Sequence, residues 1–161
     1  MDIPLINIQD VRDLLDLSDN ITEQKYNQHI ISAQNWQLRE LIGDICVDGL
    51  EDRKCSNSFT DEDLALMKLV KPYLVYYSYS KYVSNSMLHS SQDGIVKYSG
   101  DNLLQITETE KKYAKQYNEQ NAEAYAKRIL TLLKDNATDY PCYDCGDCCD
   151  STYKGKNIFL G

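Results

Sequence analysis

The chain has 161 residues, of which 42% are hydrophobic and 26% charged, and its formal net charge is −8 at pH 7. This length suffices for one domain with its own core and excludes a small scaffold that depends on disulfides. The composition excludes a disordered chain, and no run of roughly 18 apolar residues is present to cross a bilayer. Residues 1–10 resemble no secretion signal, which predicts that the chain stays in the cytoplasm where it is made.

The negative charge is concentrated at the two ends of the chain. Residues 1–59 hold 5 basic and 11 acidic side chains, and residues 136–161 hold 2 and 4, whereas residues 60–135 hold 10 of each. Proteins that bind nucleic acids through phosphates need a basic stripe that releases counterions. The sequence shows no such stripe, so specific binding to DNA or RNA is not expected.

Two amphipathic helices are expected in the first 43 residues. Apolar residues at helical spacing predict a short helix within residues 1–17. A second helix of about six turns is expected over residues 22–43, with Thr22 or Asn20 as its N-cap and Gly43 at its end. Its apolar face would hold Tyr26, Ile30, Ala33 and either Trp36 or Leu38. Residues 44–59 have no periodicity and are expected to form a polar loop.

A long central helix is predicted over residues 60–89. Thr60 can cap it, and three acidic residues in its first turn suit the helix dipole. Its residues are apolar on more than one face, which is typical of a buried helix. Pro72 removes one backbone hydrogen bond, so we expect a kink there or a division into two helices.

The last helix is predicted from a capping box. Residues 90–106 contain a short β-branched run between two glycines, which indicates a two-stranded excursion or an ordered loop. Thr107 and Glu110 then form the box, and the helix is expected to run to about Asp135. We expect Tyr113, Tyr117 and Tyr125 to share its apolar face with alanine and leucine side chains. The predicted fold is therefore a mainly α bundle of about four helices over residues 1–135, with an extended cysteine-rich tail over residues 136–161.

The tail holds a cluster of four cysteines, Cys142, Cys145, Cys148 and Cys149. Two-residue gaps let two thiolates reach one metal ion, although a structural zinc site usually takes two well-separated pairs. Cys46 and Cys55 could contribute if the tail folds back. The alternative is a tail of reduced cysteines, because disulfides are not expected in a reducing cytoplasm. Zinc is therefore a candidate ligand, and no other cofactor is expected.

No catalytic constellation is visible in the sequence. His29 and His89 lie on different predicted helices, and neither neighbours a cysteine or a cluster of acids. A Gly-rich phosphate loop, a nucleophile elbow and a paired-histidine metal motif are all missing from the sequence. The sequence therefore predicts that the protein is not an enzyme.

Most of the aromatic residues are tyrosines: the chain has 13 tyrosines, 2 phenylalanines and 1 tryptophan. Its rigid ring with a polar tip suits a half-wet protein interface. The tyrosines could therefore fill the bundle interior with their hydroxyls at its rim, or pack between subunits. The interface candidates are Tyr73, Tyr76, Tyr77, Tyr113 and Tyr117, together with the apolar tip Ile158, Phe159 and Leu160.

The order of these segments resembles that of head-tail connector proteins of tailed bacteriophages. The resemblance covers about residues 3–135: a short first helix, the helix ending at Gly43, a tyrosine-rich central helix, the insertion at Gly94, Ile95 and Val96, and a closing helix. The tyrosine- and asparagine-rich style is similar to that of crAss-like phages of gut Bacteroidales. The cysteine tail is not part of the general pattern of that family.

The resemblance implies a structural virion protein of the phage neck. Such a protein forms an α-helical ring beneath the portal, commonly of twelve subunits, and contacts the portal and other neck or tail proteins. Double-stranded DNA passes through the ring without specific binding, and an acidic lumen would repel its phosphates. The protein would be made in the bacterial host cytoplasm and would contact no membrane. The alternative function is a small zinc-binding regulatory or host-interaction module that uses the cysteine cluster.

Overall fold

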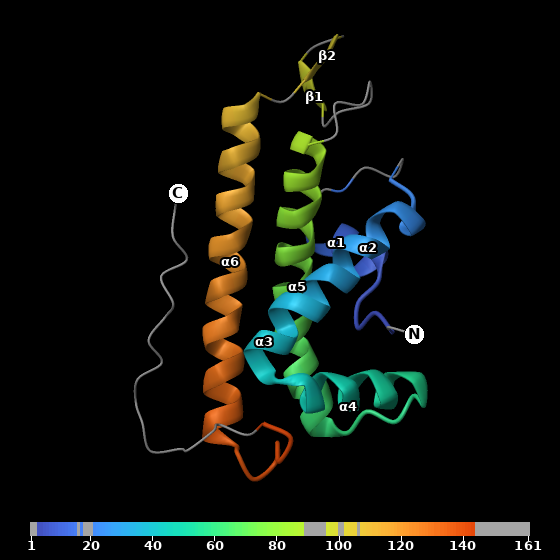
Figure 1. Ribbon diagram of the computed structural model, residues 1–161, viewed down its shortest axis with the longest axis vertical. Coiled ribbons are helices and arrows are strands. Elements are labelled where there is room, and N and C mark those ends of the chain that lie inside the picture. Colours follow the sequence, from blue (N-terminus) through green and yellow to red (C-terminus); the bar gives the residue numbers. More distant parts are fainter. Residues whose placement is uncertain are drawn as a thin grey trace.

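A computed structural model describes residues 3–15, 17, 21–88, 96–99, 102–105 and 107–143. Two long antiparallel helices, α5 (Asp61–Leu88) and α6 (Glu108–Asp135), form a column, and shorter helices pack against one side of α5 (Figure 1). The mainly α fold expected from the sequence is therefore confirmed. No helix among the described residues is both long and apolar enough to span a membrane.

The first helix, α1 (Ile8–Leu14), is the expected amphipathic segment. Asn7 and Asp10 form a capping box at its start, with Asn7 Oδ1 accepting from the Asp10 amide at 3.0 Å. Ile8 and Val11 are buried against the bundle, whereas Leu14 is exposed. The helix therefore faces the core with the residues that a 3.6-residue period places together.

The expected helix ending at Gly43 is a single rod with a π-helical insert. It comprises α2 (Glu23–Ala33), the π segment η1 (Gln34–Leu38) and α3 (Arg39–Ile42). Gly43 ends it with φ +86°, a left-handed conformation that favours glycine. Of the two alternatives for its apolar face, Leu38 is buried and Trp36 is 70% exposed. Thr22 is the N-cap residue, but its side chain makes no capping hydrogen bond.

The prediction of a polar loop over residues 44–59 was wrong. Residues Asp44–Cys55 form the helix α4, which crosses the base of the bundle (Figure 1). Only Cys46, Val47, Leu50 and Glu51 of this helix are buried. A narrow buried stripe, interrupted by Gly49 and surrounded by charged residues, gives too weak a periodicity to be recognised in the sequence.

The central helix α5 runs without interruption from Asp61 to Leu88, through Pro72. Of the two alternatives expected at Pro72, the division into two helices was therefore wrong. Proline deprives the Lys68 carbonyl of its usual helical donor, but this loss does not interrupt the helix. The predicted N-terminus is confirmed, because the Asp63 amide donates to Thr60 Oγ1 at 3.2 Å and Asp63 Oδ2 accepts from the Thr60 amide at 3.0 Å.

A hairpin joins the two long helices at the end of the column far from α4 (Figure 1). Strands β1 (Val96–Ser99) and β2 (Asn102–Gln105) are antiparallel, with Val96 opposite Gln105. This is the two-stranded alternative expected for residues 90–106. The last helix, α6, begins at the predicted capping box, where Glu110 Oε2 accepts from the Thr107 amide at 2.9 Å.

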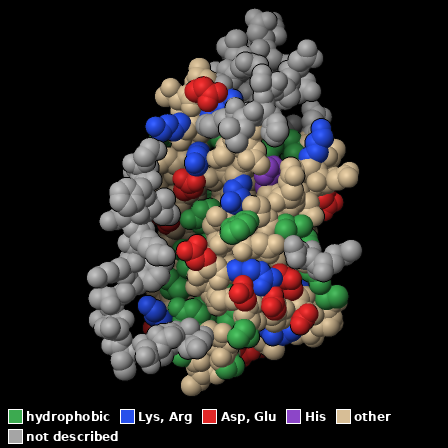
Figure 2. All heavy atoms as spheres, viewed as in Figure 1, with side chains coloured by type: hydrophobic (Ala, Val, Ile, Leu, Met, Phe, Trp, Pro, Cys, Tyr) green, Lys and Arg blue, Asp and Glu red, His purple; other side chains and the backbone are tan. Residues whose placement is uncertain are grey.

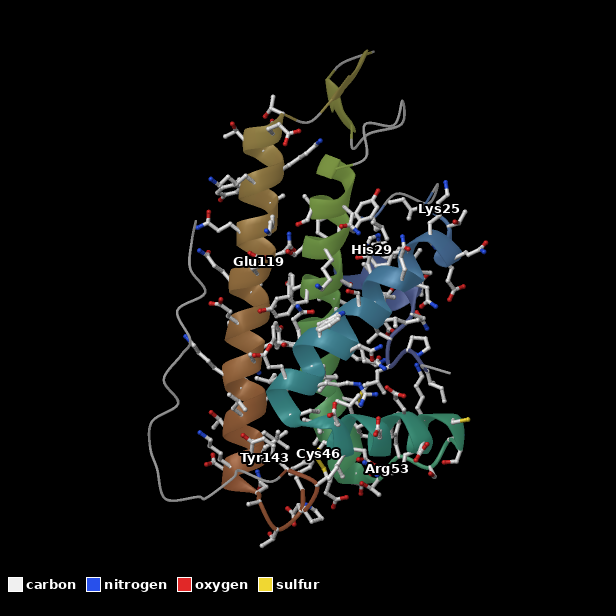
Figure 3. The ribbon with its side chains drawn as sticks, viewed as in Figure 1. Lys25, His29, Cys46, Arg53, Glu119 and Tyr143 are labelled. Atoms are coloured by element: carbon white, nitrogen blue, oxygen red, sulfur yellow. A yellow bond between two sulfur atoms is a disulfide. The ribbon has the colours of Figure 1, made fainter. Side chains whose placement is uncertain are left out.

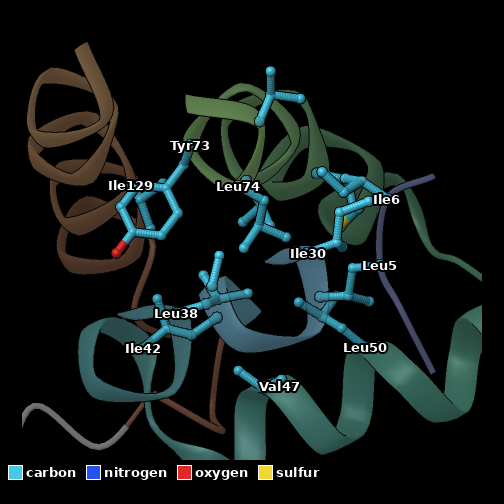
Figure 4. Packing of buried hydrophobic residues seen from close by; sticks show 14 of the residues in the cluster. Leu5, Ile6, Ile30, Leu38, Ile42, Val47, Leu50, Tyr73, Leu74 and Ile129 are labelled. Atoms are coloured by element: carbon cyan, nitrogen blue, oxygen red, sulfur yellow. The ribbon is translucent and has the colours of Figure 1, made fainter. Parts of the chain in front are cut away.

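The core lies where α5 meets α2, α4 and the lower part of α6 (Figure 4). Residues Leu5 and Ile6 of the N-terminal segment and Leu74 of α5 are fully buried there. From α6, Ile129 and Leu133 pack against this cluster. The upper half of the α5–α6 contact is more polar: Asn118 is buried, and Ser80 Oγ donates to Glu119 Oε1 at 3.0 Å.

Candidate functional site: a tyrosine edge and a C-terminal anchor

The structure separates the five predicted interface tyrosines into core and surface residues. Tyr73 is only 3% exposed and belongs to the core, where its ring lies 5.0 Å from that of Tyr77 in an edge-to-face arrangement. Tyr76 and Tyr77 are partly buried. Tyr113 and Tyr117, in contrast, are 71% and 54% exposed. Interior packing therefore occurs for Tyr73, whereas packing between subunits stays a prediction for the exposed Tyr113 and Tyr117.

The expectation that Tyr113 and Tyr117 share the apolar face of α6 was wrong. The buried face of this helix carries Asn118, Ala122, Ile129 and Leu133. Each residue advances by about 100° around an α-helix, so Tyr117 points well away from Asn118. Tyr113 lies one turn before Tyr117 and follows it to the surface.

Four tyrosines from the two long helices form one surface, which we call the tyrosine edge: Tyr76, Tyr113, Tyr117 and Tyr125. The ring of Tyr76 stacks on that of Tyr125, with centroids 6.0 Å apart. The guanidinium of Arg128 lies 5.2 Å from the Tyr125 ring centre. Burial, followed by the neighbouring phenols of Tyr125 and Tyr117, raises the pKa of Tyr76. The edge therefore presents aromatic rings, hydroxyl groups and one guanidinium.

Sequence reasoning missed Tyr125 of the tyrosine edge and its neighbour Arg128. Tyr125 was expected on the apolar face, and neither residue was among the interface candidates. Tyr125 lies eight residues after Tyr117, about 12 Å further along the helix, and the two are linked through Tyr76 of α5, which lies near both. Other large apolar side chains are also exposed among the described residues: Leu14, Trp36, Ile45 and Leu64.

The beginning of the C-terminal tail packs against the base of the bundle. Tyr140 is buried, and its hydroxyl donates to the Glu62 carbonyl in the first turn of α5 at 2.9 Å. Cys142 forms a disulfide with Cys46 of α4, across a separation of 96 residues and a Cα–Cα distance of 5.0 Å. Figure 3 shows Cys46 and Tyr143 at this end of the molecule. Residues 136–143 therefore belong to the folded body rather than to a free tail.

This disulfide bears directly on the predicted metal site. A cystine sulfur is not a thiolate, so Cys142 as the structure has it is not a metal ligand. Cys145, Cys148 and Cys149 lie outside the described residues, as do Ile158, Phe159 and Leu160. Within the described part of the chain, no group of three or more potential ligands is placed to hold a metal ion. The expectation that the cysteines form no disulfide was wrong for this pair.

Charged side chains gather on the lower front of the molecule (Figure 2). Arg39 Nη1 lies 2.6 Å from Asp48 Oδ1, and its Nη2 lies 3.0 Å from Glu51 Oε1. Glu51 also accepts from the buried Gln34 at 2.7 Å. Gln34 in turn accepts from the Leu5 amide at 2.7 Å. This network joins the N-terminal segment, η1, α3 and α4. Its charged side chains are bonded to one another, so we assign them a structural role.

His29 is buried among aromatic rings rather than placed for catalysis. Its ring lies 5.8 Å from that of Tyr26 and 5.7 Å from that of Tyr82. Burial, followed by the positive charge of Lys81, lowers the pKa of His29. His89 lies outside the described residues. The contacts of His29 are those of a packed side chain.

The chain is thus a helical-bundle protein with two distinguishing features: the exposed tyrosine edge and residues 136–143, which a disulfide links to α4. The chain belongs to DUF6712, a protein family of unknown function, whose family model matches residues 15–153. The match therefore continues from the bundle through the cysteine cluster. No curated protein and no solved structure matches the chain.

Proposed function

We propose that this protein is a structural subunit of a head-tail connector ring in the neck of a tailed bacteriophage. The tyrosine edge carries this proposal, in combination with the resemblance in segment order described above. In this proposal about twelve copies form a ring beneath the portal. The ring extends the DNA channel and joins the capsid to the tail.

The chemistry of the tyrosine edge suits a contact between protein subunits. Tyrosine is enriched in such contacts because its ring offers a large rigid apolar area, while its hydroxyl bonds to interfacial water or a partner. Tyr113 and Tyr117 expose most of this area in the isolated chain, and Arg128 adds a further residue type that is enriched at interfaces.

A closed ring needs two different surfaces on each subunit, because the contact is head-to-tail. The tyrosine edge supplies one of them. The exposed side chains of Trp36 on η1 and Ile45 on α4 supply a candidate for the other. These residues lie on elements separate from α6, as the geometry of a ring requires.

The charge distribution is compatible with a channel for DNA. The acid excess of residues 1–59 falls largely on the α1–α4 side of the bundle, where Asp44 and Asp48 are exposed beside Arg39. Negative side chains in a lumen repel phosphates, so DNA would slide without binding.

The test measures the mass of complexes between this protein and its portal by light scattering after size-exclusion chromatography. We expect a ring-sized complex containing about a dozen copies of this chain. The double variant Tyr113→Ser/Tyr117→Ser should reduce the ring fraction at least tenfold. A chain that ends at Tyr143 should also weaken the ring, if the tip at Ile158, Phe159 and Leu160 contacts a neighbour.

A matched control is the charge-neutral pair Glu123→Ser/Lys127→Ser, which changes two exposed residues one helical turn apart on the same helix. It should leave the ring intact. Truncation after Tyr143 is preferable to truncation after Asp135, because Tyr140 and Cys142 belong to the folded body. The proposal fails if the wild-type chain stays monomeric with portal present and the tyrosine variants change nothing.

The alternative function, a zinc module, requires the cysteine cluster as thiolates. Metal analysis of protein purified under reducing conditions distinguishes the two functions. Stoichiometric zinc that is lost on Cys145→Ser and Cys148→Ser, with coupled loss of folding, would favour the zinc module. The Cys46–Cys142 disulfide favours the connector, because it withdraws one of the four candidate ligands.

A further inference from the structure

A disulfide ties residues 136–143 to the base of the bundle. Cys46 lies on the buried stripe of α4 and is 1% exposed, whereas Cys142 is only partly buried. Cys142 belongs to a turn in which the Tyr143 amide donates to the Tyr140 carbonyl at 2.9 Å. The chain continues beyond this turn for residues 144–161. The bond therefore lies just before the sequence segment that holds Cys145, Cys148 and Cys149.

The two sulfur atoms differ in their access to reagents. Thiol-disulfide exchange requires a thiolate to approach one sulfur in line with the bond. The body of the protein covers Cys46 and leaves Cys142 as the sulfur that a thiolate can reach. For the same reason, when both cysteines are reduced, Cys142 is the first of the two to react with an oxidant.

We propose that Cys46 and Cys142 form a reversible covalent latch that fixes the C-terminal segment to α4 under oxidising conditions and releases it under reducing conditions. The reduced form predominates in a compartment with abundant thiols, and the oxidised form outside it. The proposal is independent of the connector function, because it concerns the state of the segment within one subunit.

Closure of the latch uses a small-molecule disulfide as the oxidant. The Cys142 thiolate attacks that disulfide, forms a mixed disulfide and displaces one thiolate, which takes up a proton. Cys46, as its thiolate, then attacks the Cys142 sulfur and displaces the second thiolate. Two protein thiols and one small disulfide thus become one protein disulfide and two small thiols. Opening is the reverse: one small thiolate attacks the Cys142 sulfur and displaces Cys46, and a second small thiolate then releases Cys142 and forms the small disulfide.

The test maps the disulfides of the full-length chain by mass spectrometry after equilibration in a glutathione buffer that is either reducing or oxidising. Hydrogen exchange of residues 136–143 is then measured in each state. We expect Cys46–Cys142 to be the dominant pair in the oxidising buffer. Reduction should accelerate exchange in residues 139–143 at least tenfold. The melting temperature should fall by about 10 °C, as expected for a cross-link that closes a long loop.

Two variants separate the latch from general effects of cysteine chemistry. Cys142→Ala retains the buried Cys46 and should exchange in the oxidising buffer as the reduced wild type does. Cys55→Ser removes a free, exposed cysteine and should change neither the pairing nor the exchange. The proposal is overturned if Cys142 instead pairs with Cys145, Cys148 or Cys149 or stays reduced. It is also overturned if the pair forms and the exchange rates of residues 139–143 are equal in the two states.

Discussion

The two long helices have the same length and the same kind of start, yet they occupy different environments. Both α5 and α6 have 28 residues, about 42 Å, and each begins at a threonine in a capping box. Helix α5 contacts α1, α2, η1 and α6, whereas α6 contacts α5 and α3. The central helix therefore organises the fold, and the outer helix keeps a surface that the bundle does not cover.

This difference appears in the residues that each helix buries. Besides Ser78 and Ser80, α5 buries apolar residues along its length, including Leu66, Val70, Leu74 and Val83. The apolar buried residues of α6 lie in its second half: Ala122, Ile129 and Leu133. Equal length and equal caps thus do not imply equal contributions to stability, because most helical stability in a protein comes from packing. The four predictions that follow test the comparison.

Removing a buried leucine from α5 should have the largest effect. Leu74→Ala should lower the free energy of unfolding by about 3 kcal/mol, because it opens a cavity where several helices meet. The matched control is Leu64→Ala on the exposed side of the same helix, which should cost less than about 1 kcal/mol. Urea denaturation measures both. Equal losses for the two variants would contradict the assignment of Leu74 to the core.

The two capping boxes should differ in strength. Asp63 also accepts from Arg53 at 2.7 and 2.8 Å, so Asp63→Ala should cost about 2 kcal/mol. Glu110→Ala, at the exposed start of α6, should cost about 0.5–1 kcal/mol. Although burial opposes it, hydrogen bonds from Arg53 and Thr60 lower the pKa of Asp63. The Asp63 contribution is therefore present above pH about 4 and is lost as the pH falls further.

Acidification should loosen the contact between α2 and α5. The folded-state pKa of His29 is lowered, so the unfolded chain binds a proton first and stability falls as the pH drops below about 6.5. His29→Gln should remove this loss between pH 7.5 and 5.5, as measured by urea denaturation at each pH. His89 is present in both proteins and cancels from the difference. An identical pH dependence in the two proteins would show that His29 does not titrate in this way.

Changes to the tyrosine edge should have the smallest effect on the isolated subunit. Tyr113→Ser and Tyr117→Ser should each change the free energy of unfolding by no more than about 0.5 kcal/mol, because both rings remain largely in water. Thermal denaturation of the monomer measures this effect. A loss of several kcal/mol would show that the tyrosines support the fold rather than form a surface for partners.

Much of the bundle could be predicted because its helices carry strong local signals. Thr60 followed by three acidic residues located the start of α5, the box of Thr107 and Glu110 located that of α6, and Gly43 located the end of α3. The glycines around residues 94–100 indicated the hairpin. Each of these signals lies within a few residues of the feature that it specifies, so no knowledge of the rest of the fold is needed.

The failures involve contacts between distant parts of the chain or a change of helical phase. Helix α4 is stabilised by burial of Cys46, Val47 and Leu50 against other elements, which a local pattern does not reveal. The disulfide joins positions 96 residues apart. The residue spacing within α6 placed Tyr113 and Tyr117 on its inner face, which was wrong. Which face of α6 meets α5 depends on the rotation of one helix relative to the other, and the spacing does not specify it.

The π segment has a consequence for how the sequence tolerates length changes. From Ile30, the buried residues Gln34, Leu38 and Ile42 recur at every fourth position, whereas an ordinary helix repeats every 3.6 residues. The wider turn absorbs this difference and keeps all four on one side. Deleting one residue between Gln34 and Leu38 would turn everything after it by about 100° and carry Arg39 away from its partners on α4. The π segment therefore sets the rotation of α3 and the direction in which the chain continues into α4.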